Sequence, residues 1–389
     1  MKTNQTPWAT LIQVAALCLV AALAPLPTLA QTSPTAQNPT SPPATVSEPD
    51  PRIGTKVIVT KAGAQLKTPD ATVWTAWLGD VYTVALTNGE WLWIAEKGGW
   101  IWEKETVPFD NAITELNALV ARSRTPENLH LRGVAYLAHQ QYQPAIADFS
   151  ASLKLNPKNA GAFNNRGKAR FLLNDHRQAV ADFTEAIRLE PTTSLFLHNR
   201  ALAWIELENY PKALTDLQSA LLENPTFPEA LNNRGIIYQK MQRYDDAIND
   251  FTAALKLNPV YVDALGNRAY SWKQKSEFAK AIADLEEAIR INPVAYEASN
   301  DLAWLLATCT NPEFRNPTRA LELAKSACTL SEYKEWNTLD TLAAALAAND
   351  QFEEAGKWSA TAVENAPPSE KERLKKHLAN IVNRQTIVE

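Results

Sequence analysis

From residue 126 to residue 369, small, apolar and polar positions recur with a period of 34 residues. Within each unit the apolar residues follow helical spacing, and a proline closes most units, where it cannot continue a helix. Small residues occupy positions 8, 20 and 27, so two helices can approach each other closely there. The pattern therefore predicts one pair of short antiparallel helices per unit. The units begin at Pro126, Ala160, Ser194, Pro228, Val262, Tyr296 and near Trp336, and the sixth carries about five extra residues.

One position of the unit carries arginine where a core residue is expected. Position 7 is Arg and position 23 is Asp in the first five units, whereas both become apolar in the last two, with Leu302 and Leu342 at position 7. A buried arginine is very costly without a partner, but a paired one is roughly neutral against an apolar pair. The joint replacement predicts a structural ion pair in each regular unit, within one repeat or between neighbours. The predicted members are Arg132, Arg166, Arg200, Arg234 and Arg268 with Asp148, Asp182, Asp216, Asp250 and Asp284.

On these positions, residues 126–369 resemble the tetratricopeptide repeat (TPR) family. The resemblance implies an all-α solenoid of about seven helix-turn-helix repeats, in which each unit buries its faces only against its neighbours. We expect both ends to be covered. Residues 109–125 would form a capping half-repeat helix with Asp110 as its N-cap. Residues 370–389 would form a C-terminal solvating helix and tail, begun by a capping box of Ser369 and Glu372.

Asparagine stands directly before the arginine in four consecutive units, at position 6. In TPR solenoids the first helix of each unit lines the inner surface, and this position resembles the asparagine ladder of O-linked N-acetylglucosamine transferases. One amide both donates and accepts, so a ladder can hold an extended peptide of any sequence. Alternatively, the amides only solvate the helices or bond neighbouring groups. The candidate peptide-binding residues are Asn165, Asn199, Asn233 and Asn267, with Asn164, Asn232, His198 and Lys168 beside them.

Before the repeats, residues 52–108 alternate between apolar and polar positions, with turn signals such as Asn88-Gly89 between the runs. About five short strands are predicted, enough for a small all-β barrel. The runs "IGTKVIV" and "GGWIWEKETV" resemble bacterial SH3-like (SH3b) domains. Six tryptophans either build the core of this barrel or form an aromatic patch that binds a peptide or glycan, as the resemblance would suggest. They are Trp74, Trp77, Trp91, Trp93, Trp100 and Trp102.

The first 51 residues have the features of a targeting segment and a tether. Residues 1–30 contain an apolar run and end in "TLA", which is typical of a signal peptide, and residues 31–51 form a Pro/Ser/Thr-rich linker. We expect export to the periplasm, the cell surface or the medium; the alternative is an uncleaved N-terminal membrane anchor. The closing repeats also resemble those of exported TPR proteins of planctomycete-like bacteria, which implies architecture and export.

Composition and motifs narrow the function. A net charge of -5 gives nucleic-acid binding no electrostatic support. The sequence has no HExxH, P-loop, Gly-rich dinucleotide turn or CxxC pair, and His130 and His198 stand two units apart, too far to share a metal ion. We therefore expect no enzyme activity, no metal and no cofactor. We expect Cys309 and Cys328 to be buried and unpaired.

Two functions of different class remain. The first is a non-catalytic protein–protein interaction scaffold of the cell envelope, which binds an extended peptide or protein segment in the TPR groove. The second is a structural protein attached to peptidoglycan or another glycan through the SH3-like domain. The expected inner positions of the repeats, among them Tyr270 and Lys273, are mixed in charge and select no peptide class. The sequence therefore predicts a protein or peptide partner without identifying it.

Overall fold

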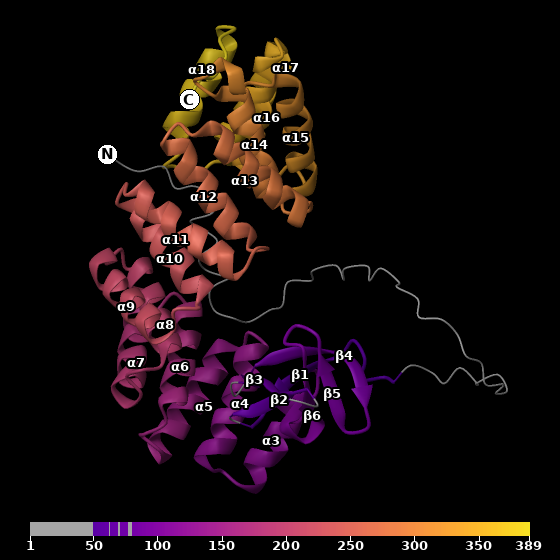
Figure 1. Ribbon diagram of the computed structural model, residues 1–389, viewed down its shortest axis with the longest axis vertical. Helices are drawn as coiled ribbons and strands as arrows, with labels where there is room; N and C mark the ends of the chain where they lie inside the picture. Colours follow the sequence, from indigo (N-terminus) through magenta and orange to yellow (C-terminus); the bar gives the residue numbers. More distant parts are fainter. Residues whose placement is uncertain (1–49, 62, 69–70, 77–79) are drawn as a thin grey trace, which may run out of the picture. The chain divides into compact units, whose positions relative to one another are not determined.

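The computed structural model describes residues 50–389, except residues 62, 69–70 and 77–79. The predicted signal peptide 1–30 and nearly all of the predicted linker lie outside the described residues. The described chain divides into two compact units, residues 50–207 and 208–389, and the division falls within the third repeat (Figure 1). The predicted fold class, a small all-β domain followed by an all-α solenoid of helix-turn-helix repeats, is confirmed.

The β domain is an antiparallel sheet of seven strands among the described residues, not of about five as predicted. The sheet thus has two more strands than the sequence pattern predicted, and its shortest strand, β7, has three residues. Across the sheet the order is β3-β2-β6-β5-β4-β1-β7. The strands are β1 (Lys56–Val59), β2 (Ala64–Lys67), β3 (Thr72–Ala76), β4 (Val81–Asn88), β5 (Trp91–Ile94), β6 (Gly99–Trp102) and β7 (Thr106–Pro108).

The β domain packs against the start of the repeats within the first compact unit. Ile58 of β1 and Val107 of β7 are buried in one apolar cluster with Leu116 and Val134 from the first helices. At the junction, the ring of Phe109 stacks on that of His139, with ring centroids 4.1 Å apart. The sheet and the first repeat therefore share a core at Phe109, where the sequence alone suggested a domain boundary.

The capping helix α3 (Ala112–Arg122) starts later than predicted. Its N-cap is Asn111, whose side chain makes no capping hydrogen bond, so the prediction of Asp110 as N-cap is wrong. The preceding residues are held in a turn instead, because the amides of Asn111 and Ala112 donate to the carbonyls of Pro108 and Phe109.

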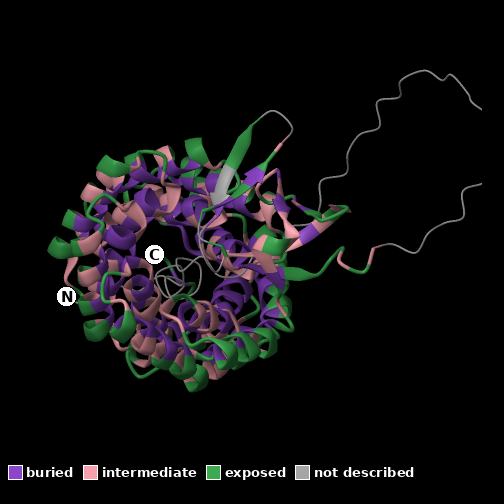
Figure 2. Ribbon diagram, turned by 90° about the horizontal axis from the view of Figure 1, so that it is seen from below, coloured by how far each residue is buried: buried purple, intermediate pink, exposed green. Residues whose placement is uncertain are grey.

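Seven successive helix pairs follow from residue 126 in the described chain, and each pair begins where the sequence alignment begins a unit. Buried residues lie along the helix surfaces that face neighbouring helices, and exposed residues along the opposite surfaces (Figure 2). In the first compact unit the paired helices are α4 (Pro126–Ala138), α5 (Tyr142–Leu155), α6 (Ala160–Leu172), α7 (His176–Leu189) and α8 (Ser194–Glu206). In the second they are α9 (Tyr210–Glu223), α10 (Pro228–Lys240), α11 (Tyr244–Leu257), α12 (Val262–Gln274), α13 (Phe278–Ile291), α14 (Tyr296–Thr308), α15 (Pro317–Leu330), α16 (Trp336–Ala348) and α17 (Phe352–Asn365), followed by α18 (Lys371–Val382).

Four of the five arginines at position 7 form ion pairs with the aspartates of their own repeat. Nε and Nη2 of Arg234 each lie 2.7 Å from a carboxylate oxygen of Asp250, which is the two-pronged geometry that makes such pairs strong. These hydrogen bonds hold the pKa of Arg234 above its usual range, although burial lowers it. The same contact joins Arg132 to Asp148, Arg166 to Asp182 and Arg268 to Asp284.

The remaining nitrogen of the guanidinium group reaches the preceding repeat. Nη1 of Arg166 donates to the Ser150 hydroxyl at 3.1 Å, and Nη1 of Arg268 donates to the Thr252 hydroxyl at the same distance. In the first repeat, Nη1 of Arg132 donates at 3.1 Å to the side-chain oxygen of an α3 residue, Asn117. Each of these arginines therefore binds within its repeat and to the preceding helix, and α3 takes the place of a preceding repeat.

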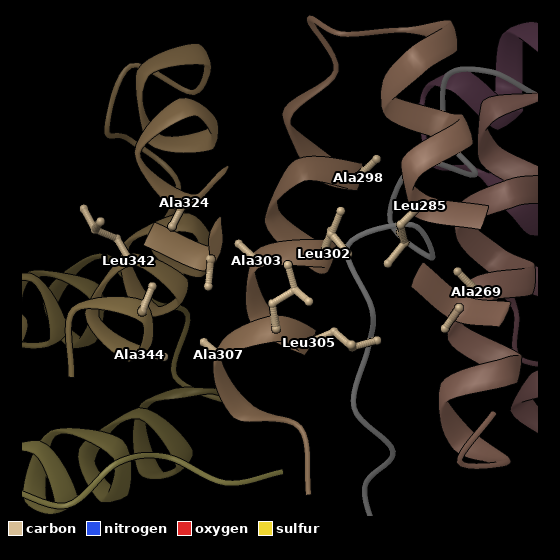
Figure 3. Close-up of a cluster of buried hydrophobic side chains, with 14 of the residues drawn as sticks. Ala269, Leu285, Ala298, Leu302, Ala303, Leu305, Ala307, Ala324, Leu342 and Ala344 are labelled. Atoms are coloured by element: carbon tan, nitrogen blue, oxygen red, sulfur yellow. The ribbon is translucent and has the colours of Figure 1, made fainter. Parts of the chain in front are cut away.

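In the last two repeats this polar bridge is replaced by apolar packing. Leu302 and Leu342 at position 7 are both almost fully buried. Figure 3 shows them in one cluster with small side chains of neighbouring helices, such as Ala303 and Ala324. An arginine at either position would have no aspartate to pair with, because position 23 is Leu323 in repeat six and Trp358 in repeat seven. Cys309 and Cys328 lie in this part of the chain, and both are buried and unpaired as predicted.

Glycine at position 8 makes room for a phenylalanine ring at position 24 of the same repeat. A Cβ atom on Gly235 would lie 2.6 Å from the ring of Phe251, closer than van der Waals contact allows. Where position 24 is the smaller Leu285, position 8 is Ala269. The hairpin core is therefore matched in size repeat by repeat. The same glycine–phenylalanine contact joins Gly133 to Phe149 and Gly167 to Phe183.

The C-terminal helix α18 is held to the last repeat by a buried histidine. Nδ1 of His377 lies 3.0 Å from Oδ2 of Asp340, and Nε2 lies 3.2 Å from Oε1 of Glu389. Burial lowers the pKa of His377, but the hydrogen bonds to Asp340 and Glu389 outweigh burial and raise the pKa to about 9. His377 is therefore a cation between two carboxylates at neutral pH.

The predicted capping box at the start of α18 is wrong. The N-cap is Glu370, and it makes no side-chain capping bond. The carboxylate of Glu372, which the box would direct back to the helix start, accepts from Nζ of Lys375 at 2.8 Å. An i,i+3 ion pair has thus replaced the expected cap.

Replacing Gly235 by alanine is expected to destabilise the chain by about 1–3 kcal/mol, because the added methyl group overlaps the Phe251 ring. In a double-mutant cycle, Gly235→Ala and Phe251→Leu should together cost less than the sum of the two single changes. Urea unfolding followed by circular dichroism measures the four free energies. Strict additivity would contradict the proposed size matching.

The His377 contact predicts a loss of stability in alkali. The folded-state pKa of about 9 lies above the ordinary value of 6.5, so the contribution is complete below about pH 6.5 and disappears as pH rises through about 9. Its size is about 3 kcal/mol. The stability difference between the parent and His377→Gln, measured by urea unfolding, should shrink strongly from about pH 6 to about pH 9.5. A difference that stays constant over this range would overturn the assignment.

Candidate functional site

The outer surface of strands β5 and β6 carries four of the six tryptophans. In the register of the two strands, Trp91 lies opposite Trp102 and Trp93 opposite Trp100. Neighbours such as Leu92 point the other way and are buried. Residues directly opposite each other share one side of a sheet, so the four indoles form one face, called here the Trp face. For these four residues the interpretation as barrel core is wrong.

The Trp face combines aromatic rings with a charged edge. The rings of Trp93 and Trp100 lie 5.2 Å apart between centroids, tilted by 58°. Nε1 of Trp102 donates to Glu90 at 3.3 Å, and Nζ of Lys104 lies 5.0 Å from the Trp102 ring centroid. Trp91 is the most open of the four, with 41% of its surface exposed. Flat indoles beside polar groups can stack on a sugar ring or a proline.

Two of the six predicted tryptophans are not in strands β5 and β6. Trp74 lies in β3. Trp77 falls outside the described residues.

The asparagines of the predicted ladder lie between successive repeats. Nδ2 of Asn199 donates to Oδ1 of Asn164 at 2.8 Å, so position 6 of one repeat binds position 5 of the repeat before. The same contact joins Asn267 to Asn232 at 3.1 Å. These four side chains are 2–4% exposed, and Asn233 is 4% exposed. The amides thus serve as bonds between repeats, and their contact with a peptide stays a prediction.

The first step of the ladder uses a histidine. Nδ2 of Asn165 lies 3.0 Å from Nε2 of His130, while Nδ2 of Asn159 lies 3.2 Å from Nδ1. Burial lowers the pKa of His130 to about 4, so the ring is neutral. Burial likewise lowers the pKa of His198, at the same repeat position, to about 4. Among the predicted groove residues, Asn165 and Lys168 are half-buried.

A cavity with a volume of about 170 Å³ lies in the second compact unit. It is lined mainly by the first helices of repeats five, six and seven, which are α12, α14 and α16 in Figure 1, and by residues at the start of α18. We call it the α12–α16 cavity. Its aromatic lining consists of Tyr270, Trp304 and Trp336, and its charged lining consists of Lys273, Asp301, Asp340, Glu370, Arg373 and Glu389.

Most charges around the α12–α16 cavity are paired. Nε of Arg373 lies 3.1 Å from Oε2 of Glu370, and Nη1 lies 3.5 Å from Oδ2 of Asp340. The hydrogen bond from His377 holds the pKa of the Glu389 carboxyl below its usual range. Lys273 differs, because burial lowers the pKa of its ammonium group while Glu389 acts only through space to raise it.

Sequence reasoning missed this cavity, although Tyr270 and Lys273 were among the expected inner positions. Its lining comes from three repeats and from residues after α18, and the repeat pattern does not place those residues against one another. One sequence signal pointed to this region. Positions 5 and 6 are Asn-Asn or Gly-Asn in repeats two, four and five, but they are Asn300 and Asp301 in repeat six.

Within residues 50–389, as far as the structure describes them, no three His, Cys, Asp or Glu side chains are grouped so that they could hold a metal ion. In the same residues, no helix combines the length and the apolar character needed to cross a membrane.

Comparisons with known proteins concern the repeats. Family models described as tetratricopeptide repeat match residues 130–192, 164–230 and 228–261. No curated protein matches this chain.

Solved structures are similar in fold. A tetratricopeptide repeat protein from Parabacteroides merdae ATCC 43184 is 24% identical with a TM-score of 0.52, and the match covers 67% of this chain and 100% of that one. A chain of the APC/C hetero-tetramer Cut9-Hcn1 is 22% identical with a TM-score of 0.52, and the match covers 61% of this chain and 46% of that one. The helix pairs and the matched family models agree: this chain contains tetratricopeptide repeats, built as an α-solenoid.

Proposed function

We propose that this protein is a non-catalytic protein–protein interaction scaffold of the cell envelope that binds an extended peptide or protein segment at the α12–α16 cavity. The proposal depends on one observation: the first helices of three successive repeats surround a cavity with both aromatic and charged side chains. Tetratricopeptide repeats are in general interaction modules without catalytic groups, which supports the same conclusion.

The size of the cavity favours a side chain as its occupant. An apolar cavity of about 150 Å³ holds a molecule the size of benzene, whereas pockets for drug-sized ligands measure about 300–1,000 Å³. The α12–α16 cavity, at about 170 Å³, therefore has room for a single side chain of a partner. A longer segment would continue along the first helices beyond it.

The envelope location rests on the sequence. Residues 1–30 have the features of a signal peptide, and a Pro/Ser/Thr-rich linker follows. We propose export to the periplasm, the cell surface or the medium, with an uncleaved N-terminal anchor as the alternative.

The Trp face supports a second candidate function. Four indoles on one outer surface of a small sheet form an aromatic patch of the kind that stacks on carbohydrate. With the resemblance to SH3-like domains, this patch is a candidate attachment site for peptidoglycan or another glycan. The repeats would then bind a protein partner while the β domain binds the cell wall.

The scaffold function predicts that partner capture depends on the α12–α16 cavity. In the chain from residue 31, the double change Tyr270→Ala and Trp336→Ala should lower the capture of a specific envelope protein at least about tenfold, because buried aromatic anchors carry much of the affinity of an interface. Quantitative affinity capture from envelope extract measures this. The control, Tyr333→Ala, removes an exposed ring of the same compact unit that does not line the cavity. Equal capture by all three chains would count against the proposal.

The second candidate predicts binding to the cell wall through the Trp face. Trp91→Ala combined with Trp102→Ala should reduce co-sedimentation with purified peptidoglycan sacculi about tenfold, since the stacking surface is lost. Leu155→Ala, which removes an exposed apolar side chain of α5, serves as the control. If the parent chain does not sediment with sacculi, or if the tryptophan variant sediments equally well, the Trp face does not attach the protein to the wall.

A further inference from the structure

Three carboxylates beside the α12–α16 cavity make no ion pair in the part of the chain that the structure describes. They are Asp263, Glu297 and Glu335, called here the acidic cluster. Burial raises the pKa of Glu297, and the charges of three nearby carboxylates raise it further. These are Asp301, Asp263 and Glu335. Like charges held close together in partly buried positions cost free energy, and a bound cation would remove that cost.

The acidic cluster continues into the wall of the cavity through Asp301. This residue lines the cavity, and its charge acts on Glu297. The lining holds four carboxylates and two cations. The buried His377 cation, which pairs with two of these carboxylates, brings the cations to three. One negative charge therefore remains in excess in the wall itself, before the acidic cluster is added.

The two cations of the lining are offset by carboxylates of the same wall. The charges of Glu389 and Asp301 act through space on Lys273, whose pKa is lowered by burial. Arg373 pairs with Glu370 at 3.1 Å. An anionic occupant would thus enter a wall that is already negative, whereas a cationic occupant would neutralise it.

Two of the three aromatic side chains in the lining already lie against cations of this chain. The guanidinium carbon of Arg373 lies 5.8 Å from the Trp336 ring centroid, and the ring of His377 lies 5.6 Å from that of Trp304. The third ring, that of Tyr270, has no ring or cation partner among the described residues. An aromatic face attracts a cation within about 6 Å of its centroid. Tyr270 therefore offers a place for the cation of a bound molecule.

A buried acceptor in the lining also lacks a donor. Asn300 lines the cavity and is 5% exposed, and its Oδ1 has no hydrogen-bond partner among the described residues. Its amide nitrogen donates to Asp301 at 3.3 Å, so the oxygen is the group that is left over. Guanidinium and ammonium groups only donate, whereas an ionised carboxylate only accepts. The unpaired oxygen thus also favours a basic occupant.

We propose that the α12–α16 cavity and the acidic cluster bind an extended basic segment of a partner protein, with one arginine or lysine side chain inside the cavity. This inference rests on the proposed function, because it names the chemistry of the bound segment. The cation in the cavity lies against the Tyr270 ring and donates to Asn300. Further basic residues of the segment pair with the acidic cluster, which spans repeats five and six and the start of repeat seven.

A hexapeptide of alternating arginine and serine residues tests this directly. It carries an uncharged fluorophore at its N-terminus and an amide at its C-terminus, so the guanidinium groups are its only charges. The control probe has citrulline, the neutral analogue of arginine, at the same places. Fluorescence anisotropy with the full chain, at about 0.15 M salt to screen weak surface attraction, should show at least about tenfold tighter binding of the arginine probe. Equal affinity for the two probes would overturn the proposal.

Two matched double variants locate the binding on the acidic cluster. Asp263→Asn combined with Glu297→Gln should weaken binding of the arginine probe at least about tenfold, because two of its charge partners are lost. Glu353→Gln combined with Glu354→Gln removes the same charge from exposed positions of α17 and should change the affinity less than about twofold. If both double variants weaken binding equally, the probe responds only to the net charge of the protein and the proposal fails.

A change inside the cavity separates recognition there from attraction to the surface. Tyr270→Leu keeps an apolar side chain but removes the aromatic face, and it should weaken binding of the arginine probe about fivefold. Tyr333→Leu, at an exposed ring that does not line the cavity, should leave binding unchanged. Thermal unfolding by circular dichroism shows which chains are folded, and the amide variants of the acidic cluster keep the test decisive if Tyr270→Leu unfolds. Equal binding by the parent and a folded Tyr270→Leu chain would overturn the placement of a cation in the cavity.

Three further outcomes separate this inference from its alternatives. Spermidine, a small polyamine with about the same charge as the probe, should displace it only at concentrations at least about tenfold above those of unlabelled peptide, because it lacks a peptide backbone. Displacement at equal concentrations would mean that the site binds small polycations and not a protein segment. If capture from envelope extract depends on the cavity but the arginine and citrulline probes bind alike, the inference fails and the scaffold function stands. If the arginine probe binds as expected but no envelope protein is captured, the inference stands and the scaffold function fails.

Discussion

A helix hairpin of this size cannot bury both of its faces by itself, so every part of the repeats depends on contact with the next hairpin. The arginine at position 7 makes that contact polar and directional. Its guanidinium group binds an aspartate within the repeat and, for Arg166 and Arg268, a hydroxyl group on the preceding helix. A single side chain thus joins the two helices of a repeat and links that repeat to the one before it.

The same constraint explains the ends of the array. Arg132 has no preceding repeat, and Asn117 of α3 supplies the acceptor instead. Ile58 and Val107 of the sheet are buried in the same cluster as residues of α3 and of the first repeat. The β domain therefore helps to cap the first repeat. At the other end the arginine series stops, Leu302 and Leu342 replace it, and α18 covers the last hairpin. A polar bridge is thus replaced by apolar packing in the last two repeats.

The sequence predicted the features that follow from the 34-residue repeat. It missed features that depend on local turns and on the residues after α18, which fold back onto α14. The start of every first helix, the identity of the arginine partners and the unpaired cysteines follow from a 34-residue repeat and helical geometry. The caps predicted at Asp110 and Ser369 were wrong, because the residues before α3 form a local turn and Glu372 pairs with Lys375. Alternation placed Trp91 and Trp93 on one side of a strand but could not say which side faced the core. The α12–α16 cavity could not be predicted, because residues that follow α18 turn back onto α14.

The asparagines show why spacing alone does not locate a binding site. An asparagine repeated in successive first helices can bind a peptide or bind the neighbouring repeat, and both roles give the same sequence pattern. Asn199 and Asn267 are buried with their amide groups donating to asparagines of the preceding repeats. At Lys273 and Asn300 that mutual satisfaction fails, close to where the arginine series ends. Regular repeats use their polar groups on one another, and the proposed recognition site lies where this regularity stops.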